Sequence, residues 1–182
     1  LLVMMLNMLT SFEETNNANV FNLEFNSSEY IHLITEIERR AYADRATHLG
    51  DEDFWQVPSE LLLSKIYAKD RIQNISIDSS TNSNEIKAGV NPFSESEETT
   101  HYSVIDKYGN AVSVTTTINS GYGSGITVTG AGFILNNEMD DFSSKPGVPN
   151  MFGLIGNEAN AIEPHKRPLS SMTPTIVLKE KE

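Results

Sequence analysis

A polar, acidic stretch at residues 75–98 divides the chain into two parts with different sequence patterns. It reads ISIDSSTNSNEIKAGVNPFSESEE and has few residues that a hydrophobic core could use, which is typical of a flexible surface segment. Apolar residues before it recur at helical spacing, whereas those after it alternate as in strands. The chain is therefore predicted to be α+β, with helices first and strands second.

Three helices are predicted before the junction. Residues 1–12 are apolar on most sides, as in a buried helix. Ser27 or Ser28 can cap a second helix, which Gly50 is predicted to stop. Pro58 is predicted to open a third helix. The apolar stripe of that helix would be Leu61, Leu62, Ile66 and Tyr67.

A β-hairpin is predicted directly after the junction. Residues 101–105 alternate, DKYGN supplies a turn, and AVSVTTTI returns. Two stretches rich in Gly, Pro and Asn, residues 119–142 and 143–168, are expected to be largely loops. LSSMTPTIVL, at residues 169–178, is predicted to end in a strand.

Composition excludes several function classes. The formal net charge of -12 argues against nucleic acid or an anionic membrane as the main partner. The absence of cysteine excludes disulfides, thiolate zinc sites and a cysteine nucleophile. NNEMDD lacks the ligand spacing of a calcium loop, so neither a metal nor a cofactor is expected. The basic cluster at residues 165–167 is interpreted as solvated surface.

Two adjacent threonines, Thr99 and Thr100, stand where the junction meets the first strand. A threonine hydroxyl needs a base, and a backbone cut just before the residue supplies an α-amino group with a pKa of about 7.7–8.0. Such a site needs hydroxyl or amide donors nearby, which Thr117 and Asn119 can supply from the return strand. His101 is expected to face away from Thr117 and to pack. Threonine-rich strands are also common, so a plain structural hairpin is the alternative.

Three long motifs carry a family resemblance. ETTHYSVIDKYGNAVSVTTTIN, GFILNNEMDDFSSKPGVPN and KRPLSSMTPTIV, in that order, resemble the γ-glutamyltranspeptidases of bacterial type. AYADRATHLGDEDFWQVP is similar to a segment near the end of that family's large subunit. The resemblance covers nearly the whole chain. It implies the N-terminal nucleophile (Ntn) hydrolase fold, an αββα sandwich, of which this chain would form a part.

The family resemblance also implies a precursor that cleaves itself between Glu98 and Thr99. Residues 1–98 would be the C-terminal part of the large subunit and residues 99–182 the N-terminal part of the small subunit. Thr99 would be the catalytic nucleophile, with Thr100 as the competing candidate. A periplasmic or secreted location follows from the family alone.

Further roles follow from the same resemblance, position by position. Thr117 matches the family's second threonine, which hydrogen-bonds the nucleophile. The residues that would hold the α-amino group of the substrate are Asn119, Glu138 and Asp141. A substrate ammonium is well matched by carboxylate and amide oxygens, since charge-assisted hydrogen bonds are the strong ones.

Ser170 and Ser171 match the pair that hydrogen-bonds the α-carboxylate. SSKPGVPNMFG matches the lid, in which Phe152 stands where many bacterial members carry a tyrosine. The family's upstream arginine and its downstream Gly-Gly pair lie outside these residues. This stretch alone is therefore expected to be an inactive part of a longer protein.

The implied reaction is transfer or hydrolysis of γ-glutamyl groups through a threonine ester. The donor would be glutathione or another γ-glutamyl amide, and the acceptor an amino acid, a peptide or water. Two alternatives stay open. One is an amidase of the same fold that acts on a cephalosporin side chain or capsular poly-γ-glutamate. The other is a non-catalytic interaction module.

Overall fold

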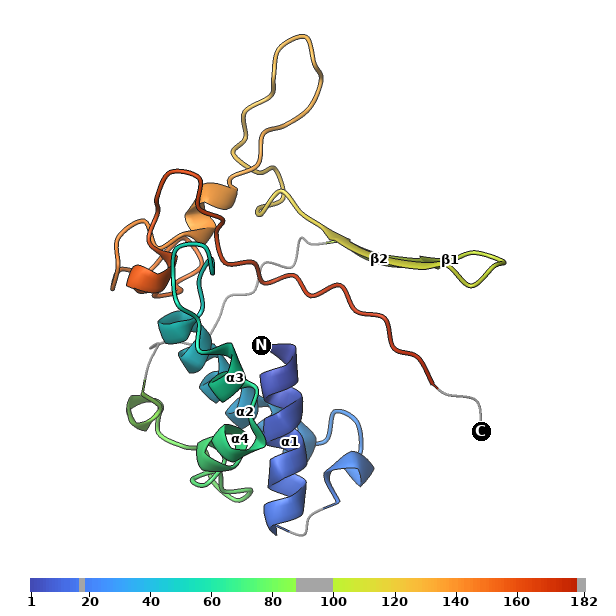
Figure 1. Ribbon diagram of the computed structural model, residues 1–182, viewed down its shortest axis with the longest axis vertical. Coiled ribbons are helices and arrows are strands. Elements are labelled where there is room, and N and C mark those ends of the chain that lie inside the picture. Colours follow the sequence, from blue (N-terminus) through green and yellow to red (C-terminus); the bar gives the residue numbers. More distant parts are fainter. Residues whose placement is uncertain (17–18, 88–99, 180–182) are drawn as a thin grey trace.

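The computed structural model describes residues 1–16, 19–87 and 100–179. In the described residues before the junction there are four α-helices: α1 (Leu2–Asn16), α2 (Ser28–His48), α3 (Ser59–Leu62) and α4 (Lys65–Arg71). They pack together at one end of the molecule, while a two-stranded hairpin and long loops extend away from them (Figure 1). The order of helices first and strands second, and with it the mixed α+β class, is confirmed for these residues.

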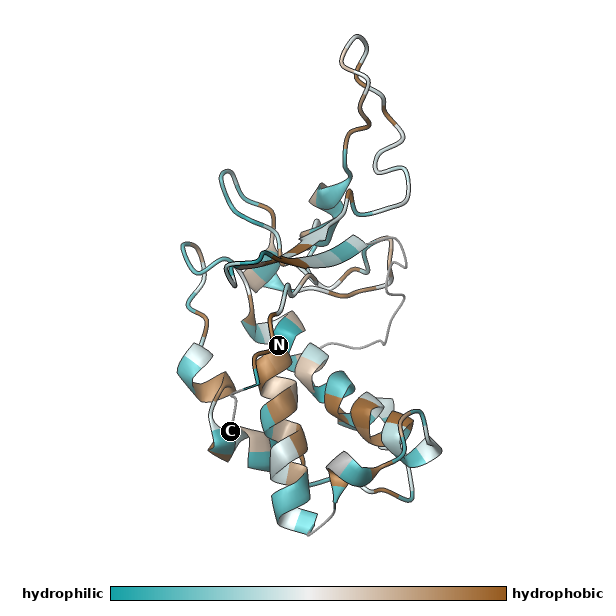
Figure 2. Cartoon of the chain, turned by 90° about the vertical axis from the view of Figure 1, so that its right-hand side faces the viewer, coloured by the Kyte–Doolittle hydropathy of each residue, from teal (hydrophilic) through white to brown (hydrophobic). Residues whose placement is uncertain are grey.

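The hydrophobic core lies among the helices, where α1 packs against both α2 and α4. Met4, Met8 and Phe12 are spaced four residues apart on α1 and are buried, which puts one continuous stripe into the core. Apolar residues recur along α1 in Figure 2. From α2, Leu33 and Ile37 meet this stripe. Each such side chain contributes about 1.5–3 kcal/mol by leaving water.

Both ends of α2 lie where the sequence predicts them. The Ser27 hydroxyl caps α2, accepting a hydrogen bond from the Tyr30 amide at 3.2 Å, as expected. α2 ends at His48 with Leu49 as its cap, so Gly50 stands directly after the cap, where the sequence places the stop residue. A Cβ on Gly50 would lie 2.2 Å from the Ala159 carbonyl oxygen, so glycine is needed there for close packing.

The single helix predicted after Pro58 is wrong. The chain forms α3 and α4 instead, and the Ser64 hydroxyl caps α4 by accepting from the Tyr67 amide at 3.1 Å. Of the predicted stripe, Leu61 and Ile66 are exposed, whereas Tyr67 packs against the core. The break changes which residues face the core, and Leu62 is buried.

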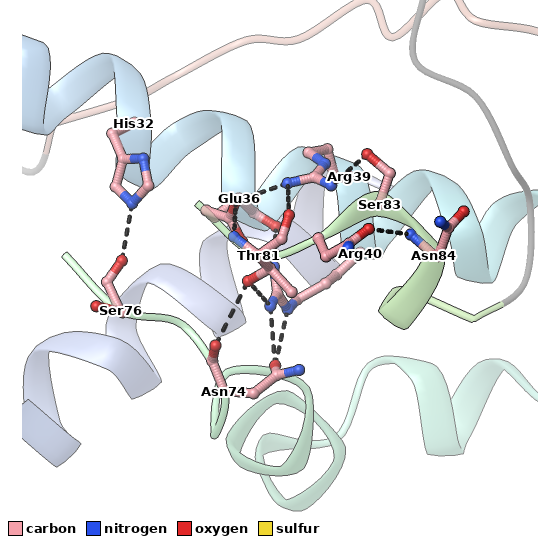
Figure 3. Close-up of polar contacts among 10 residues, drawn as sticks. His32, Glu36, Arg39, Arg40, Asn74, Ser76, Thr81, Ser83 and Asn84 are labelled. Atoms are coloured by element: carbon pink, nitrogen blue, oxygen red, sulfur yellow. Dashed lines mark hydrogen bonds and ion pairs between the residues drawn. The ribbon is translucent and has the colours of Figure 1, made fainter. Parts of the chain in front are cut away.

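A buried ion pair within α2 is hydrogen-bonded to Asn74 and Thr81, which lie in the segment that follows α4 (Figure 3). Glu36 and Arg40, both 1% exposed, form a 2.6 Å contact. Arg40 also donates to the Asn74 side chain at 2.8 Å and to the Thr81 hydroxyl at 2.9 Å. The amide of Thr81 donates to Glu36 at 3.1 Å. We define these four residues as the Glu36 network.

The Glu36 network corrects the prediction of a flexible segment for residues 75–87. Ile75 and Ile86 are buried there, and the backbone between them is tied to α2 at Thr81. The reason is that buried charges on α2 require polar partners, which a Ser- and Asn-rich segment can supply. Residues 88–98, the remainder of the predicted junction, lie outside the described residues.

The hairpin is confirmed. Strands β1 (Thr100–Ile105) and β2 (Ala111–Thr116) pair antiparallel, with Thr100 opposite Thr116. The Asp106 carboxylate closes the turn by accepting from the amides of Tyr108 and Asn110 at 2.8 and 2.9 Å. The strand predicted at the end of residues 169–178 is wrong for the described chain, where no ladder pairs with this segment. A strand needs such a partner for its backbone groups.

The αββα sandwich is not formed by the residues that the structure describes, whose only sheet has two strands. Tyr102, Val104, Ile105 and Val112 on that sheet are exposed. Within the same residues, no helix combines the length and apolarity needed to cross a bilayer.

Candidate active site

A cavity of about 230 Å³ lies between the C-terminal half of α2 and the loops at residues 140–171. Two of the residues predicted to bind substrate, Asp141 and Ser171, line it. Arg45 of α2 and Lys145 of the loop add positive charge to its wall. The wall thus offers groups suited to a carboxylate and groups suited to an ammonium.

The carboxylates of Glu138 and Asp141 belong to one short 3₁₀ turn, η3 (Glu138–Asp141). Burial, followed by the adjacent Asp141 carboxyl, raises the pKa of Glu138 to about 7. Burial also raises the pKa of Asp141, although Glu138 and Arg45 act in the opposite direction. Two carboxyls this close resist ionising together, and a bound cation would relieve that cost. The turn therefore has the electrostatics of an ammonium site.

Thr117 and Asn119 are linked to Asn137, the residue that precedes this turn. The Asn119 amide donates to the Thr117 hydroxyl at 2.9 Å, and its side-chain amide donates to the Asn137 carbonyl at 3.2 Å. Asn119 is buried and has a φ of 76°, a left-handed conformation that asparagine adopts more readily than most residues. Three predicted site residues, Thr117, Asn119 and Glu138, are thus held in one neighbourhood.

The serine pair approaches the cavity from the C-terminal segment. Arg45 Nη2 donates to the Ser170 carbonyl oxygen and to the Ser171 hydroxyl, both at 3.4 Å. Burial lowers the pKa of Arg45, and Tyr42 and Asp141 oppose that shift. The sequence reasoning missed Arg45. The sequence signal that could have identified Arg45 is its position in AYADRATHLGD, a segment that resembles the family.

Phe152, predicted to be in the lid, is held by its backbone: its amide donates to the Asn150 side chain at 3.0 Å. Residues on either side of it, Met151 and Leu154, line the cavity. Asp140 orients this loop, because its carboxylate accepts from the Met151 amide at 3.0 Å. The loop therefore borders the site, as a lid would.

Glu98 and Thr99, the predicted cleavage pair, lie outside the described residues. Two residues further on, His101 Nδ1 is 2.8 Å from the Thr115 hydroxyl. Residues directly opposite each other on paired strands share a face, and Thr115 and Thr117 occupy alternate positions. The expectation that His101 faces away from Thr117 is therefore wrong.

The basic cluster at residues 165–167 is exposed at His165 and Arg167, as expected, but not at Lys166. Lys166 is buried and pairs with Glu163 at 2.9 Å. Arg167 binds Asp51, which belongs to the loop that follows α2. In the described part of the chain, no group of three or more His, Cys, Asp or Glu residues is placed to hold a metal ion.

Comparison with known proteins identifies the family. A family model described as Gamma-glutamyltranspeptidase matches residues 1–182. The glutathione hydrolase proenzyme of Escherichia coli K12 is 49% identical over 179 residues, which are 98% of this chain and 30% of the relative. That of Pseudomonas aeruginosa is 48% identical over 172 residues, 94% of this chain and 30% of the relative.

One relative of lower identity is named as an acylase, and solved structures of the family are similar as well. The acylase ACY 1 proenzyme of Pseudomonas sp. strain SE83 is 36% identical over 176 residues, 97% of this chain and 28% of the relative. A crystal structure of a Helicobacter pylori gamma-glutamyltranspeptidase mutant matches 44% of this chain and 43% of its own, at 72% identity and a TM-score of 0.43. The chain spans about 30% of the length of the first two curated relatives. It belongs to the gamma-glutamyltranspeptidase family.

Proposed function

We propose that the complete gene product transfers or hydrolyses γ-glutamyl groups, with Thr99 as nucleophile after self-cleavage between Glu98 and Thr99. The observation that carries the proposal is the register of the hairpin, in which Thr100 lies opposite Thr116. Thr117 directly follows β2, at the end of the hairpin where β1 begins, so the chain leads from this end of the hairpin to both proposed hydroxyls.

Self-cleavage would create the base that catalysis needs. The Thr99 hydroxyl attacks the carbonyl carbon of Glu98, the peptide C–N bond breaks, and an ester links Glu98 to Thr99 Oγ. Water then hydrolyses this ester, leaving a carboxylate on Glu98 and a free α-amino group on Thr99. In its neutral form that amine can take the hydroxyl proton during each later turnover.

In the proposed reaction, Thr99 Oγ attacks the γ-carbonyl carbon of the donor. The amine leaves with a proton, and the γ-glutamyl group remains on Thr99 as an ester. Water, an amino acid or a peptide then attacks the ester and restores the hydroxyl. Of this chain's residues, Thr117 would hydrogen-bond the nucleophile and keep it aimed.

Substrate recognition would use both charged ends of the γ-glutamyl group. Asn119, Glu138 and Asp141 would hold the α-ammonium, and the high pKa of Glu138 supports a site that awaits a cation. Ser170 and Ser171 would hold the α-carboxylate. Arg45 beside them makes the local charge positive. Phe152 belongs to the loop that would cover the site.

The proposed precursor would yield two subunits that stay together, with residues 1–98 in the large and 99–182 in the small one. Within such a protein the exposed hairpin would join a larger sheet, completing the Ntn-hydrolase αββα sandwich. Glutathione is the proposed donor because two glutathione hydrolase proenzymes are nearly 50% identical to this chain. A periplasmic or secreted location is proposed on the same basis.

One alternative is an acylase that acts on another amide, which the likeness to the ACY 1 proenzyme favours. Such a donor need not carry an α-amino acid end, whereas Glu138 and Asp141 are suited to one. Activity on γ-glutamyl-p-nitroanilide and on glutaryl-p-nitroanilide separates the two, since the glutaryl compound lacks the ammonium. A preference for the glutaryl compound would contradict the proposed donor.

Replacing the nucleophile tests the mechanism. Thr99→Ala in the complete gene product is expected to leave a single uncut chain without activity. Thr100→Ala, which removes the competing hydroxyl, is expected to be cut. A Thr99→Ala protein that is active and cut into two pieces would refute the assignment. If Thr99→Ala and Thr100→Ala were both uncut and inactive, the assignment of Thr99 rather than Thr100 as the nucleophile would fail.

A further inference from the structure

We propose that Asp51 and Arg45, which lie upstream of the proposed cut, are positioning residues for the carboxylate-binding pair Ser170 and Ser171. This inference rests on the proposed function. We call the contacts of Asp51 with Arg167 and of Arg45 with the serine pair the clamp.

The first half of the clamp is a multiply bonded ion pair. Asp51, 7% exposed, accepts through Oδ2 from both the backbone amide and Nε of Arg167, at 2.9 and 2.8 Å. Arg167 Nη2 donates to the other oxygen, Oδ1. These bonds hold the pKa of Asp51 well below its usual range. One carboxylate therefore fixes both the side chain and the backbone of Arg167.

The backbone between Arg167 and the serines has little remaining freedom. Pro168 restricts its own φ to near -65°. The Leu169 amide donates to the side chain of Asn160, a buried residue, at 3.1 Å. Arg45 then contacts the next two residues, through the Ser170 carbonyl and the Ser171 hydroxyl. Every non-proline residue from 167 to 171 thus has a polar anchor.

The region around the clamp is closely packed. Gly50 lies so near Ala159 that a Cβ would collide with its carbonyl oxygen. The Asn157 side chain donates to the Ala46 carbonyl at 3.3 Å. The end of α2 and the following loop therefore form a packing surface for residues 157–171. After the proposed cut, this surface would belong to the large subunit and the serine pair to the small one, and noncovalent contacts alone would join them here.

This arrangement predicts an effect on binding of one end of the substrate. Serine hydroxyls discriminate a carboxylate only if they are held in place, because hydrogen bonds weaken with small errors of distance and angle. Loosening the Asp51 half of the clamp should weaken binding of the α-carboxylate while leaving Thr99 and the ammonium site unchanged, whereas Arg45 also acts on Asp141. The signature is a higher KM with kcat retained.

Asp51→Asn in the complete protein is the first test. It removes the charge that binds Arg167 and should raise KM for γ-glutamyl-p-nitroanilide by about 10- to 100-fold, the range expected when hydrogen bonds to a charged substrate group are lost. Arg45→Gln should raise the same KM. Asp53→Asn is the matched control, because Asp53 also pairs with Arg167, at 2.8 Å, but its side chain is 78% exposed. Its effect should stay below about twofold.

A donor without the α-carboxylate sharpens the test. 4-Aminobutyryl-p-nitroanilide keeps the ammonium and the scissile amide, so its KM should be the same in wild type and in Asp51→Asn. An unchanged KM for the γ-glutamyl donor in both Asp51→Asn and Arg45→Gln overturns the proposal. So does an equal rise for the two donors, which would mean general loss of structure.

Amide hydrogen exchange separates failure of the clamp from failure of the proposed function. Asp51→Asn should speed exchange in the peptide that spans residues 162–172, and Asp53→Asn should not. If the wild type accepts no γ-glutamyl donor, the proposed function fails and the role in substrate binding fails with it. Equal exchange in both variants would show that Asp51 does not hold this segment.

Discussion

Replacing Arg40 with methionine should destabilise the helical part by about 3 kcal/mol. Breaking a buried ion pair by removing one partner costs about 3–5 kcal/mol, because the other charge stays buried. Here Glu36 would keep the Arg39 guanidinium at 2.7 Å and the Thr81 amide at 3.1 Å. That residual pairing puts the expected cost at the lower end of the range. Asn74 Oδ1 would lose both of its bonds from Arg40.

Urea denaturation of the complete protein, followed through exchange of the amides of α2, measures this cost. Lys69→Met is the matched control, because Lys69 pairs with Glu14 at 3.4 Å with both side chains about half exposed. Such a surface pair contributes roughly 0–1 kcal/mol. In the double variant Glu36→Gln with Arg40→Met, part of the loss should return, since residue 36 no longer carries a buried charge and Arg39 keeps its bonds to the Thr81 carbonyl and the Ser83 hydroxyl. An Arg40→Met cost no larger than that of Lys69→Met would refute the reasoning.

Two further predictions concern pH and packing. The raised pKa of Glu138, about 7, means that the folded state keeps a proton which the unfolded chain has lost above its ordinary value near 4.5. Its contribution to stability is therefore fully present below pH 4.5 and is lost as pH rises through about 7. Glu138→Gln should flatten that part of the stability profile, and an unchanged slope would contradict the pKa assignment. Gly50→Ala should lower stability by about 1–3 kcal/mol, because the new Cβ would overlap the Ala159 carbonyl oxygen. Thermal unfolding of the variant measures this, and parental stability would mean that the contact is loose.

The sequence predicted the elements that depend on neighbouring residues alone. The hairpin followed from alternation around DKYGN, and the cap of α2 from a serine before a helical pattern. The split between α3 and α4 was missed because Ser64 can stand inside a helix or cap a new one, and tertiary packing decides. A final strand was predicted at residues 169–178 from apolar content, which cannot reveal whether a pairing partner exists.

Most residues of the candidate site were predicted from motifs. The motifs missed the contacts between residues that are far apart in the sequence. Asp141 and Ser171 do line one cavity, and Thr117 and Asn119 do adjoin η3. Arg45 and Asp51 escaped notice because their partners lie more than a hundred positions away. In the sequence alone, an arginine near the end of a helix and an aspartate in a loop are indistinguishable from solvated surface charges, because their partners become adjacent only in the folded chain.

The bond between Glu98 and Thr99 is the most direct test of the account. Intact-mass spectrometry of the purified complete gene product, with sequencing of each N-terminus, would locate any cut. We predict two associated pieces, the smaller of which begins Thr-Thr-His-Tyr, and one uncut chain for Thr99→Ala. A wild-type protein that stays whole yet hydrolyses γ-glutamyl amides, or a cut at any other bond, would contradict the central claim.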